Sequence, residues 1–589
     1  MNRDFAGLQN DWDISQTDFS GVKVRVMDTT LREGAQGPGT GLTHKNKLLI
    51  AAALSEVGAD VLEIGHASAP ADTPENLLPI IQELNFNGAP VLRMLSRGME
   101  KDIDWSAEVL KDVDVSRKEI HIYIPTDPNI NHRMKGDSEQ ARKENTLVAI
   151  RKNITYAKTQ GFHSIQFSPE GGLTTPDFDF LCKSCIVAIE SGATVLNIPD
   201  TLGRLDPFEA SKRFALLRQV LEPIMVQNGV IFSAHMHNDD GMANANTLGA
   251  VMASVGSMKK DGFHTQIETS LLGFGERNGI ASIATLATRI GEKNGHIGVK
   301  IGPLLYAVSH AAMRVTGYNA NDQSSTIGDT IFMNSAGVHH AGQVQAKKAE
   351  GSAGGYLNTG RIAAFGISPK ETVFYQSGTT ILADILNRNG INIDRTIPTG
   401  AEKLTKFMQE INAELLNAQG WKEWNIMRAW YEQEGNFSWN ESNDSQTIGF
   451  SFLGNEYTIP AKEDSSHRLS YIGGMIVGIN EFFEQQNIPW RMSEEMGYTV
   501  HDKETSADAA KQIVAHSSLV QKILGDGKLE GDIKGLGFCE LNIELTHVGI
   551  GEKKMISSRA SGTNMQLATM RAMIEGAVLP LLSANASQK

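Results

Sequence analysis

The sequence predicts an α/β fold, in which a closed (β/α)8 TIM barrel is followed by helical subdomains and a C-terminal α+β domain. Its 589 residues are too many for one core, so several domains are expected. From Val22 to about Ile290, short β-rich runs alternate with helix-length segments. Polar residues stand at the ends of those runs, where a barrel gathers its site. A doubly wound sheet is the alternative, and the polar strand ends favour the barrel.

Eight runs in this region have the length and residue content of parallel strands. They are Val22–Met27, Val61–Ile64, Val91–Leu95, Ile120–Ile124, Ser164–Phe167, Thr194–Ile198, Ile231–His237 and Thr265–Thr269. The intervals hold segments long enough for crossover helices, such as Lys45–Val57, Asn145–Gln160 and Pro207–Leu221. One strand followed by one helix, repeated around the chain, is the pattern of the barrel.

The segment after the barrel predicts small helical subdomains. Lys300–Gly317 is helical in pattern, and Tyr318–Thr330 is rich in Asn, Asp and Ser, as in a loop. A glycine-rich loop at Ala349–Gly360 precedes two helical stretches, Pro369–Asn387 and Lys403–Trp424.

A further module is predicted to begin near Asn436. Apolar residues alternate along two strands, one with Ile448, Phe450 and Phe452 and one with Cys539, Leu541, Ile543 and Leu545. Helices are expected at Ile472–Gln485 and from Asn564 to about Leu582. This order predicts an α+β domain with an internal pseudo-repeat. The predicted parts are an N-terminal extension (1–21), the barrel (22–296), a linker with helical subdomains (297–435) and the C-terminal domain (436–589).

Composition excludes several classes of function. The net charge of −14 argues against nucleic acid and anionic membranes as partners. No run approaches the roughly 18 apolar residues of a membrane span, and the polar, acidic stretch Met1–Ser20 is unlike a secretory signal. Three cysteines cannot form a disulfide framework, so a reducing cytoplasm is expected. Cys182 and Cys185 have CxxC spacing, but they lie in the amphipathic segment Phe178–Ser191 and are interpreted as buried helix cysteines.

The candidate metal site is built from strand ends. His235 and His237 flank Met236, and residues i and i+2 of a strand face the same side. Glu33, after the first strand, can add a carboxylate, and such a set suits Zn²⁺, Mn²⁺ or Mg²⁺. Three protein ligands leave positions open for a chelating 2-oxo acid. Taken singly, each residue also has a purely structural interpretation: Glu33 could form a structural ion pair with Arg32, and His235 and His237 could be core histidines.

Other strand-end residues have side chains suited to acid–base or oxyanion chemistry. Arg32 is adjacent to Glu33 and can stabilise a developing enolate or alkoxide oxygen. Thr201 can donate a hydrogen bond to a substrate carboxylate, and Glu170 is a candidate acid or base.

Five segments in chain order resemble a known superfamily. They are Asp28-Thr-Thr-Leu-Arg-Glu-Gly-Ala-Gln36, Phe167-Ser-Pro-Glu170, Asn197-Ile-Pro-Asp-Thr-Leu-Gly203, His235-Met-His-Asn-Asp-Asp-Gly-Met-Ala243 and Gly275-Glu-Arg-Asn-Gly279. Together they resemble the metal-dependent TIM-barrel lyases and synthases, which include 2-isopropylmalate, homocitrate and citramalate synthases and 3-hydroxy-3-methylglutaryl-CoA lyase. The resemblance continues through Gly328–His339 and Gln376–Gly378, which are similar to the subdomains of the synthases.

The resemblance implies a Claisen-type condensation of acetyl-CoA with a metal-bound 2-oxo acid, followed by thioester hydrolysis. It implies that Glu170 and His339 are catalytic, with His339 reaching the barrel of a neighbouring subunit in a homodimer. It also implies that Gln36 lies with Arg32 and Thr201 at the substrate. Tyr356 is the nearest candidate for a tyrosine that the same subdomain often contributes.

The branch of the superfamily stays open. The lyases carry a cysteine in the loop that corresponds to Leu271–Glu276, and this chain has none there. Glu33 and Ile280 resemble homocitrate synthase, and Arg93 and Arg97 are consistent with it because basic residues there hold a second substrate carboxylate. Structural pairing of both arginines is the alternative.

The tail favours a different branch. Its length resembles isopropylmalate and citramalate synthases, whose C-terminal domains bind a feedback amino acid. A purely structural or dimerising tail is the alternative. An aldolase or lyase of the same superfamily and a ligand-sensing barrel without turnover are the remaining alternatives.

Overall fold

The structure is a computed structural model, and its described residues fall into two compact units, one before and one after residue 319. The described residues are 19–37, 40, 42–127, 134–316, 325–328, 331, 333–334, 336, 338–339, 341–342, 359–366, 370–371, 373, 377–417, 423–439, 447–460, 470–492, 497–500, 538–547, 553–561 and 573–587. Each unit is described by itself.

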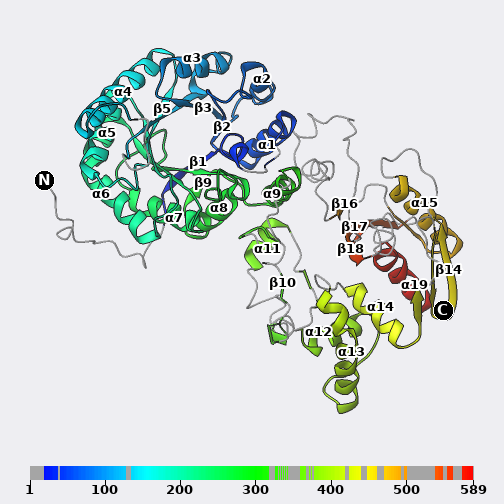
Figure 1. Cartoon of the computed structure of the whole chain (residues 1–589). Helices are drawn as coiled ribbons and strands as arrows, with labels where there is room; N and C mark the ends of the chain where they lie inside the picture. Colours follow the sequence, from blue (N-terminus) through cyan, green and yellow to red (C-terminus); the bar gives the residue numbers. More distant parts are fainter. Residues whose placement is uncertain are drawn as a thin grey trace. The chain divides into compact units, whose positions relative to one another are not determined.

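The first unit is a barrel of parallel strands. Its strands are β1 (Lys23–Asp28), β2 (Val61–His66), β3 (Val91–Arg97), β4 (Lys118–Pro125), β5 (Ser164–Glu170), β6 (Val195–Asp200), β7 (Ile231–Met236) and β8 (Thr265–Thr269). Each strand pairs with the next, and β1 pairs in parallel with both β2 and β8, which closes the sheet into a ring (Figure 1). A short strand, β9 (His296–Ile297), pairs with the start of β1.

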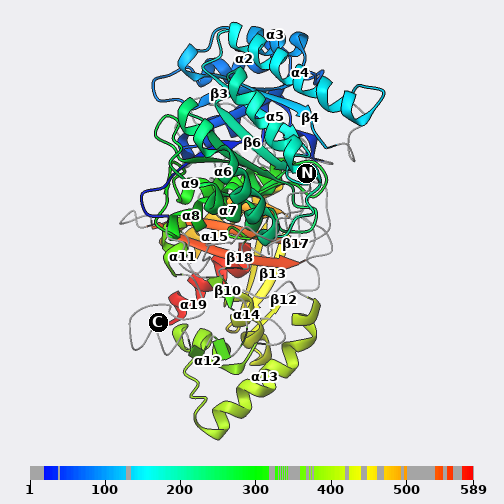
Figure 2. The same ribbon diagram turned by 90° about the vertical axis from the view of Figure 1, so that its left-hand side faces the viewer.

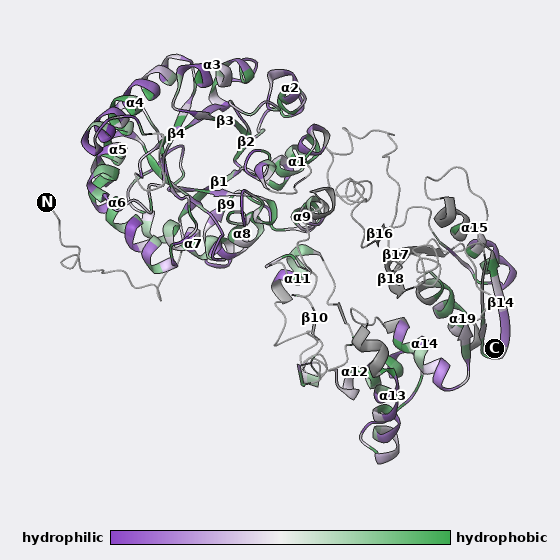
Figure 3. Cartoon of the chain, viewed as in Figure 1, coloured by the Kyte–Doolittle hydropathy of each residue, from purple (hydrophilic) through white to green (hydrophobic). Residues whose placement is uncertain are grey.

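Helices cover the outside of the ring (Figures 1 and 2). They are α1 (His44–Val57), α2 (Pro74–Glu83), α3 (Glu100–Val109), α4 (Glu139–Thr159), α5 (Phe178–Ser191), α6 (Pro207–Asn228), α7 (Ala243–Ser254), α8 (Ile283–Glu292) and α9 (Pro303–Thr316). Their mixture of hydrophilic and hydrophobic residues is visible in Figure 3 and fits helices with one face on the sheet. The sequence fixes the ends of α6: Asp206 caps it in a capping box with Glu209, and Gly229 ends it in a left-handed conformation.

The inside of the barrel is polar. Arg25 donates to Glu119 at 2.9 Å, and Arg93 also pairs with Glu119. Arg93 and Glu119 are completely buried, and neighbouring arginines lower the pKa of Glu119 well below its usual range against the opposing effect of burial. Two buried arginines therefore pair with the same buried carboxylate in this layer.

The second unit contains small sheets and helices. Its strands are β10 (Met333–Asn334), β11 (Lys370–Glu371), β12 (Phe437–Trp439), β13 (Thr447–Phe452), β14 (Asn455–Pro460), β15 (Trp490–Met492), β16 (Gly497–Val500), β17 (Phe538–His547) and β18 (Lys553–Ser561). Its helices are α11 (Thr359–Phe365), α12 (Thr379–Arg388), α13 (Pro398–Asn417), α14 (Glu423–Gln433), α15 (Ser470–Gln485) and α19 (Leu579–Ser587). Helices α12, α13 and α14 share a core that includes Leu382, Phe407 and Trp430. Strands β12–β14 form an antiparallel sheet, and β17 pairs with β15, β16 and β18 in another.

The predicted fold class is confirmed, and the predicted barrel strands are present with small changes at their ends. The alternating runs near Phe450 and Leu541 form β13 and β17. Cys182 and Cys185 are buried in α5 as expected, and burial raises the pKa of the Cys182 thiol to about 12. Most of the predicted loops at Tyr318–Thr330 and Ala349–Gly360 lie outside the described residues. Within the described part of the chain, no helix has the length and hydropathy needed to cross a membrane.

Replacing Glu119 with Gln tests the polar interior. The change removes the carboxylate with which buried Arg25 and Arg93 both pair, so the free energy of unfolding should fall by about 3–5 kcal/mol. Urea unfolding followed by circular dichroism measures the shift. Glu108→Gln is the matched control, because the ion pair of Glu108 with Lys111 is exposed and should contribute less than about 1 kcal/mol. Equal shifts for the two variants would contradict the argument.

Candidate metal and substrate site

The site lies where β1, β7 and β8 end. His235 is the fifth residue of β7, and His237 follows the strand and forms an antiparallel bridge with Ile280, in the loop after β8. The backbone N–H of Asn238 also donates to the carbonyl of Gly279 at 2.9 Å. The end of β7 and the loop after β8 are thus joined by backbone contacts, which position both imidazoles.

The two imidazoles converge. The Nε2 atoms of His235 and His237 are 3.3 Å apart, and the ring planes make an angle of 74°. Two nitrogens that each bind one ion at about 2.1 Å lie about 3.0–3.4 Å from each other, so this spacing suits a shared metal. Both histidines are buried, and His237 Nδ1 has no hydrogen-bond partner among the described residues.

A hydrogen bond defines the role of each nitrogen of His235. Its Nδ1 lies 2.7 Å from Oε2 of Glu268, a buried carboxylate on β8. Burial works against ionisation of Glu268, but the hydrogen bond and charge of His235 outweigh it and lower the pKa of Glu268. An ionised carboxylate can only accept, so Nδ1 of His235 carries the proton. Burial lowers the pKa of His235, but the hydrogen bond and charge of Glu268 outweigh it and raise that pKa, so Nε2 offers a lone pair once the imidazole is neutral.

The histidine without a carboxylate partner behaves differently. Burial and the adjacent His235 lower the pKa of His237 to about 3. His237 is therefore a neutral imidazole, which is the form that binds metals.

Glu33 lies in the turn after β1, next to Arg32. Arg32 donates from Nε to Glu63 at 2.6 Å and from its terminal nitrogen to Glu33, and Oε1 of Glu33 accepts the backbone N–H of Glu276 at 3.0 Å. Burial alone would raise the pKa of Glu33, but Arg32 and the two histidines lower it to about 2. The carboxylate is ionised and interacts electrostatically with both imidazoles, while its oxygens contact Arg32 and Glu276.

The donor set fits a divalent ion in part. His235 and His237 offer two nitrogen ligands, and neutral imidazoles with a nearby carboxylate suit Zn²⁺ or Mn²⁺. Within the described residues, no group of three His, Cys, Asp or Glu side chains is arranged to hold an ion, and Glu33 is paired with Arg32. The structure therefore brings the two histidines together and places Glu33 beside them.

The other predicted site residues lie at several places. Thr201 follows β6, and its hydroxyl accepts the backbone N–H of Gly171 at 3.0 Å. Glu170 ends β5 and is half-buried, and Gln36 is exposed at the end of the short 3₁₀ turn Gly34–Gln36. His339 belongs to the second unit and is exposed there, and Tyr356 lies outside the described residues.

The two arginines of β3 are both paired within the protein. Arg93 is completely buried and donates to Glu119 and to Oε1 of Gln166. Arg97 forms two hydrogen bonds with Asp102, at 2.7 and 3.0 Å. Structural pairing, which the sequence leaves open, is thus present for each.

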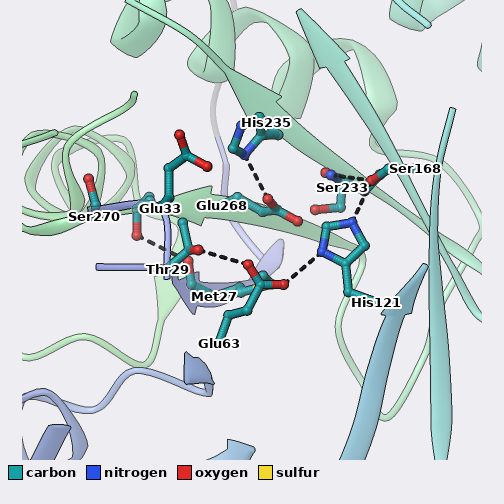
Figure 4. A network of polar contacts seen from close by, with 12 residues as sticks. Met27, Thr29, Glu33, Glu63, His121, Ser168, Ser233, His235, Glu268 and Ser270 are labelled. Carbon is teal, nitrogen blue, oxygen red and sulfur yellow. Dashed lines mark hydrogen bonds and ion pairs between the residues drawn. The ribbon is translucent and has the colours of Figure 1, made fainter. Parts of the chain in front are cut away.

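Sequence reasoning missed a second histidine with a carboxylate partner. His121 Nδ1 is 2.7 Å from Oε1 of Glu63, and its Nε2 is 2.6 Å from the hydroxyl of Ser168, which also accepts from Asn197 at 2.8 Å. Figure 4 shows His121 facing Glu63 and His235 facing Glu268. Because Glu63 also accepts from Arg32, this network reaches the candidate metal site.

A signal for the missed residues was present in the sequence. Strands of a parallel barrel are buried on both sides, so polar residues at every second position are unexpected there unless they contact one another. Such alternation occurs at Glu119 and His121 on β4, at Gln166 and Ser168 on β5, and at Gln266 and Glu268 on β8.

Comparison with known proteins gives a consistent result. The family model described as HMGL-like matches residues 23–310. A 2-isopropylmalate synthase of Sulfolobus acidocaldarius is 33% identical over 325 residues, which cover 55% of this chain and 76% of that protein. A 2-isopropylmalate synthase of Xanthomonas euvesicatoria is 32% identical over 327 residues, 55% of this chain and 58% of that longer relative. The barrel also matches a solved HMG-CoA lyase from Bacillus subtilis at 16% identity and a TM-score of 0.41, over 51% of this chain and 96% of that one.

Gly279→Ala tests the loop that joins β8 to the histidines. Gly279 has a φ of +87°, and an added Cβ would lie 1.9 Å from the carbonyl oxygen of Gly273. The variant should move the loop and weaken metal binding together with thermal stability. Gly229→Ala is the control, because its φ is +64° with no atom within 4 Å, so only the backbone cost of about 1 kcal/mol applies. Melting curves and Co²⁺ titrations compare the two, and indistinguishable results would refute the role of the loop.

Proposed function

The chain belongs to the HMGL-like family of metal-dependent TIM-barrel enzymes, and from this membership we propose that it condenses acetyl-CoA with a 2-oxo acid and hydrolyses the resulting thioester. The reaction is of the acyltransferase type that turns the acyl group into an alkyl group on transfer. Relatives named 2-isopropylmalate synthase support this activity. The convergence of His235 and His237 at the strand ends is the single observation that carries it.

The proposed metal ligands are His235, His237 and Glu33. When bound there, a divalent ion would supply Lewis acidity to the ketone of the 2-oxo acid. The ionised state of Glu33 and the neutral state of His237 suit this role. Zinc, manganese and magnesium are the candidates.

Arg32 is proposed to stabilise negative charge on the reacting oxygens. Burial disfavours its charge, but Glu63, Glu33 and Glu268 raise the pKa of Arg32 further above its usual range, so the guanidinium stays charged. The two carboxylates that it contacts hold it in one orientation, as electrostatic stabilisation requires.

Thr201, which follows β6, is proposed to bind substrate, and Glu170, at the end of β5, is proposed to transfer a proton. Because the Thr201 hydroxyl oxygen already accepts from Gly171, its proton can be directed to a substrate carboxylate. Glu170, half-buried at the end of β5, is proposed to move a proton during enolisation or hydrolysis. Gln36, in the turn after Glu33, is proposed to contact substrate from the rim.

The proposed acceptor is 2-oxoisovalerate, which places the reaction in leucine biosynthesis. Arg93 is completely buried against Glu119 and Gln166 and cannot hold a second substrate carboxylate, and Nε and one terminal nitrogen of Arg97 are engaged by Asp102. This supports an acceptor with an apolar arm over 2-oxoglutarate. The names of the relatives support the same choice.

Three further expectations concern the whole protein. His339 is proposed to complete the site of a second subunit in a homodimer, and residues after about Asn436 are proposed to bind a feedback amino acid. A cytoplasmic location, expected from the few cysteines, stays a prediction.

Thiol release from acetyl-CoA tests the activity. With 2-oxoisovalerate, pyruvate, oxaloacetate and 2-oxoglutarate offered in turn, release should be fastest with 2-oxoisovalerate. His235→Ala and His237→Ala should each lose bound metal and reduce release by about 100-fold or more, since Lewis acidity contributes several kcal/mol. His296→Ala, a matched change at an exposed histidine, should alter neither. Carbon–carbon cleavage without thiol release would identify a lyase. Binding of metal and 2-oxo acid without any turnover would identify a sensor.

Mixing inactive subunits tests the role of His339. If His339 acts on the site of a second subunit, co-refolded His237→Ala and His339→Ala chains regain activity, because a mixed dimer holds one intact site. Random pairing predicts about a quarter of the wild-type rate. If the mixture stays as inactive as its parents, His339 acts within its own chain. An active His339→Ala chain would show that His339 has no catalytic role.

A further inference from the structure

Behind His235, the structure contains a row of buried side chains whose hydrogen bonds converge on Glu268 from both sides. Gln166 on β5 donates from Nε2 to Oε1 of Glu268, and Glu268 accepts Nδ1–H of His235 on its other oxygen at 2.7 Å. Gln166 and Glu268 are completely buried, so each polar atom must find its partner inside the barrel. Figure 4 shows Glu268 lying against His235.

The orientation of the Gln166 amide is fixed from behind. Its Oε1 accepts from Nε2 of Gln266 at 2.7 Å and from a terminal nitrogen of Arg93. Arg93 has only donors, and Gln266 directs its amide nitrogen here and to Ser233 at 3.0 Å. Turning the Gln166 amide over would set its NH₂ against two donors, so its nitrogen must face Glu268.

We propose that Gln166 and Glu268 are positioning residues that hold His235 in the Nδ1–H tautomer, so that its Nε2 lone pair is available to a metal. This inference rests on the proposed metal role of His235. The direction of one hydrogen bond determines the tautomer: Glu268 can only accept, so the imidazole nitrogen that faces it must carry the proton. Ligand histidines commonly depend on such a partner, and its loss typically weakens metal binding by about 10- to 100-fold.

Glu268→Gln separates direction from shape. The new amide is isosteric, but it meets Gln166 on one side and His235 on the other. The arrangement that satisfies every group has its oxygen accepting from Gln166 and its NH₂ donating to Nδ1 of His235. That arrangement moves the imidazole proton to Nε2 and removes the lone pair from the site. We therefore expect metal affinity to fall by about 10- to 100-fold.

Exchanging the two residues should restore binding. In the double variant Gln166→Glu with Glu268→Gln, the carboxylate at 166 accepts from Arg93, Gln266 and the new amide. The oxygen of that amide is then free to accept from His235 Nδ1–H, as in the native protein. The double variant keeps the native number of charges, so recovery of at least about tenfold in affinity reports the direction of the hydrogen bonds alone.

The experiment measures Zn²⁺ and Co²⁺ dissociation constants by chelator competition, without substrates, on the full chain, together with the Co²⁺ absorption spectrum and the melting temperature. A weakened Glu268→Gln and a recovered double variant support the proposal. Native affinity in Glu268→Gln overturns it, and so does a double variant that melts like the native protein yet does not recover. Should Glu268→Gln fail to fold, the folded double variant decides: near-native affinity supports the proposal, and weak affinity overturns it. A native protein that binds no metal would instead refute the proposed function, which distinguishes the two failures.

Discussion

The barrel depends on matching the donors and acceptors of buried polar side chains along its axis. Arg25 and Arg93 both donate to Glu119. Gln166 accepts from Arg93 through its carbonyl oxygen and donates to Glu268 through its amide nitrogen. Because none of these groups reaches water, a mismatch at one position leaves an unsatisfied group at another. Strand register is part of the same constraint, since a shift by one residue would exchange the interior and exterior sets.

Charge compensation links this interior to the reactive end. Glu63 joins Arg32 and His121, and Glu268 joins His235 and the amide of Gln166. Each of these carboxylates thus accepts hydrogen bonds from one residue at the site and from another residue next to the site. The orientation of each site residue is consequently fixed by a buried carboxylate, and the orientation of that carboxylate is fixed by a second hydrogen-bond partner. This is the requirement for a preorganised centre.

Much of the fold and part of the site could be predicted from sequence. The strands were recognisable because β-branched runs alternate with helices, and Arg32, His235 and His237 were recognisable because they lie at or just after the ends of such runs. The contacts were not, because they depend on barrel closure and on local irregularity, such as the register shift between Glu63 and Gly65 where β2 meets β3. The position of Arg93 along β3 made substrate contact and internal pairing equally plausible, and only the register with Glu119 distinguishes them. His339 belongs to a unit whose relation to the barrel no sequence pattern specifies.

The pairing of Arg93 with a buried carboxylate and a buried amide has a consequence for how such a barrel can evolve. A residue whose donors hold a neighbouring carboxylate and amide cannot be recruited for a new substrate by one mutation, since its release would strand several partners at once. Diversification of acceptor preference should therefore accumulate at the rim, in loops whose changes are nearly independent. Descendants of one ancestor would then differ in what they accept while inheriting the same axial row of side chains, with substitutions inside it appearing only in compensated pairs.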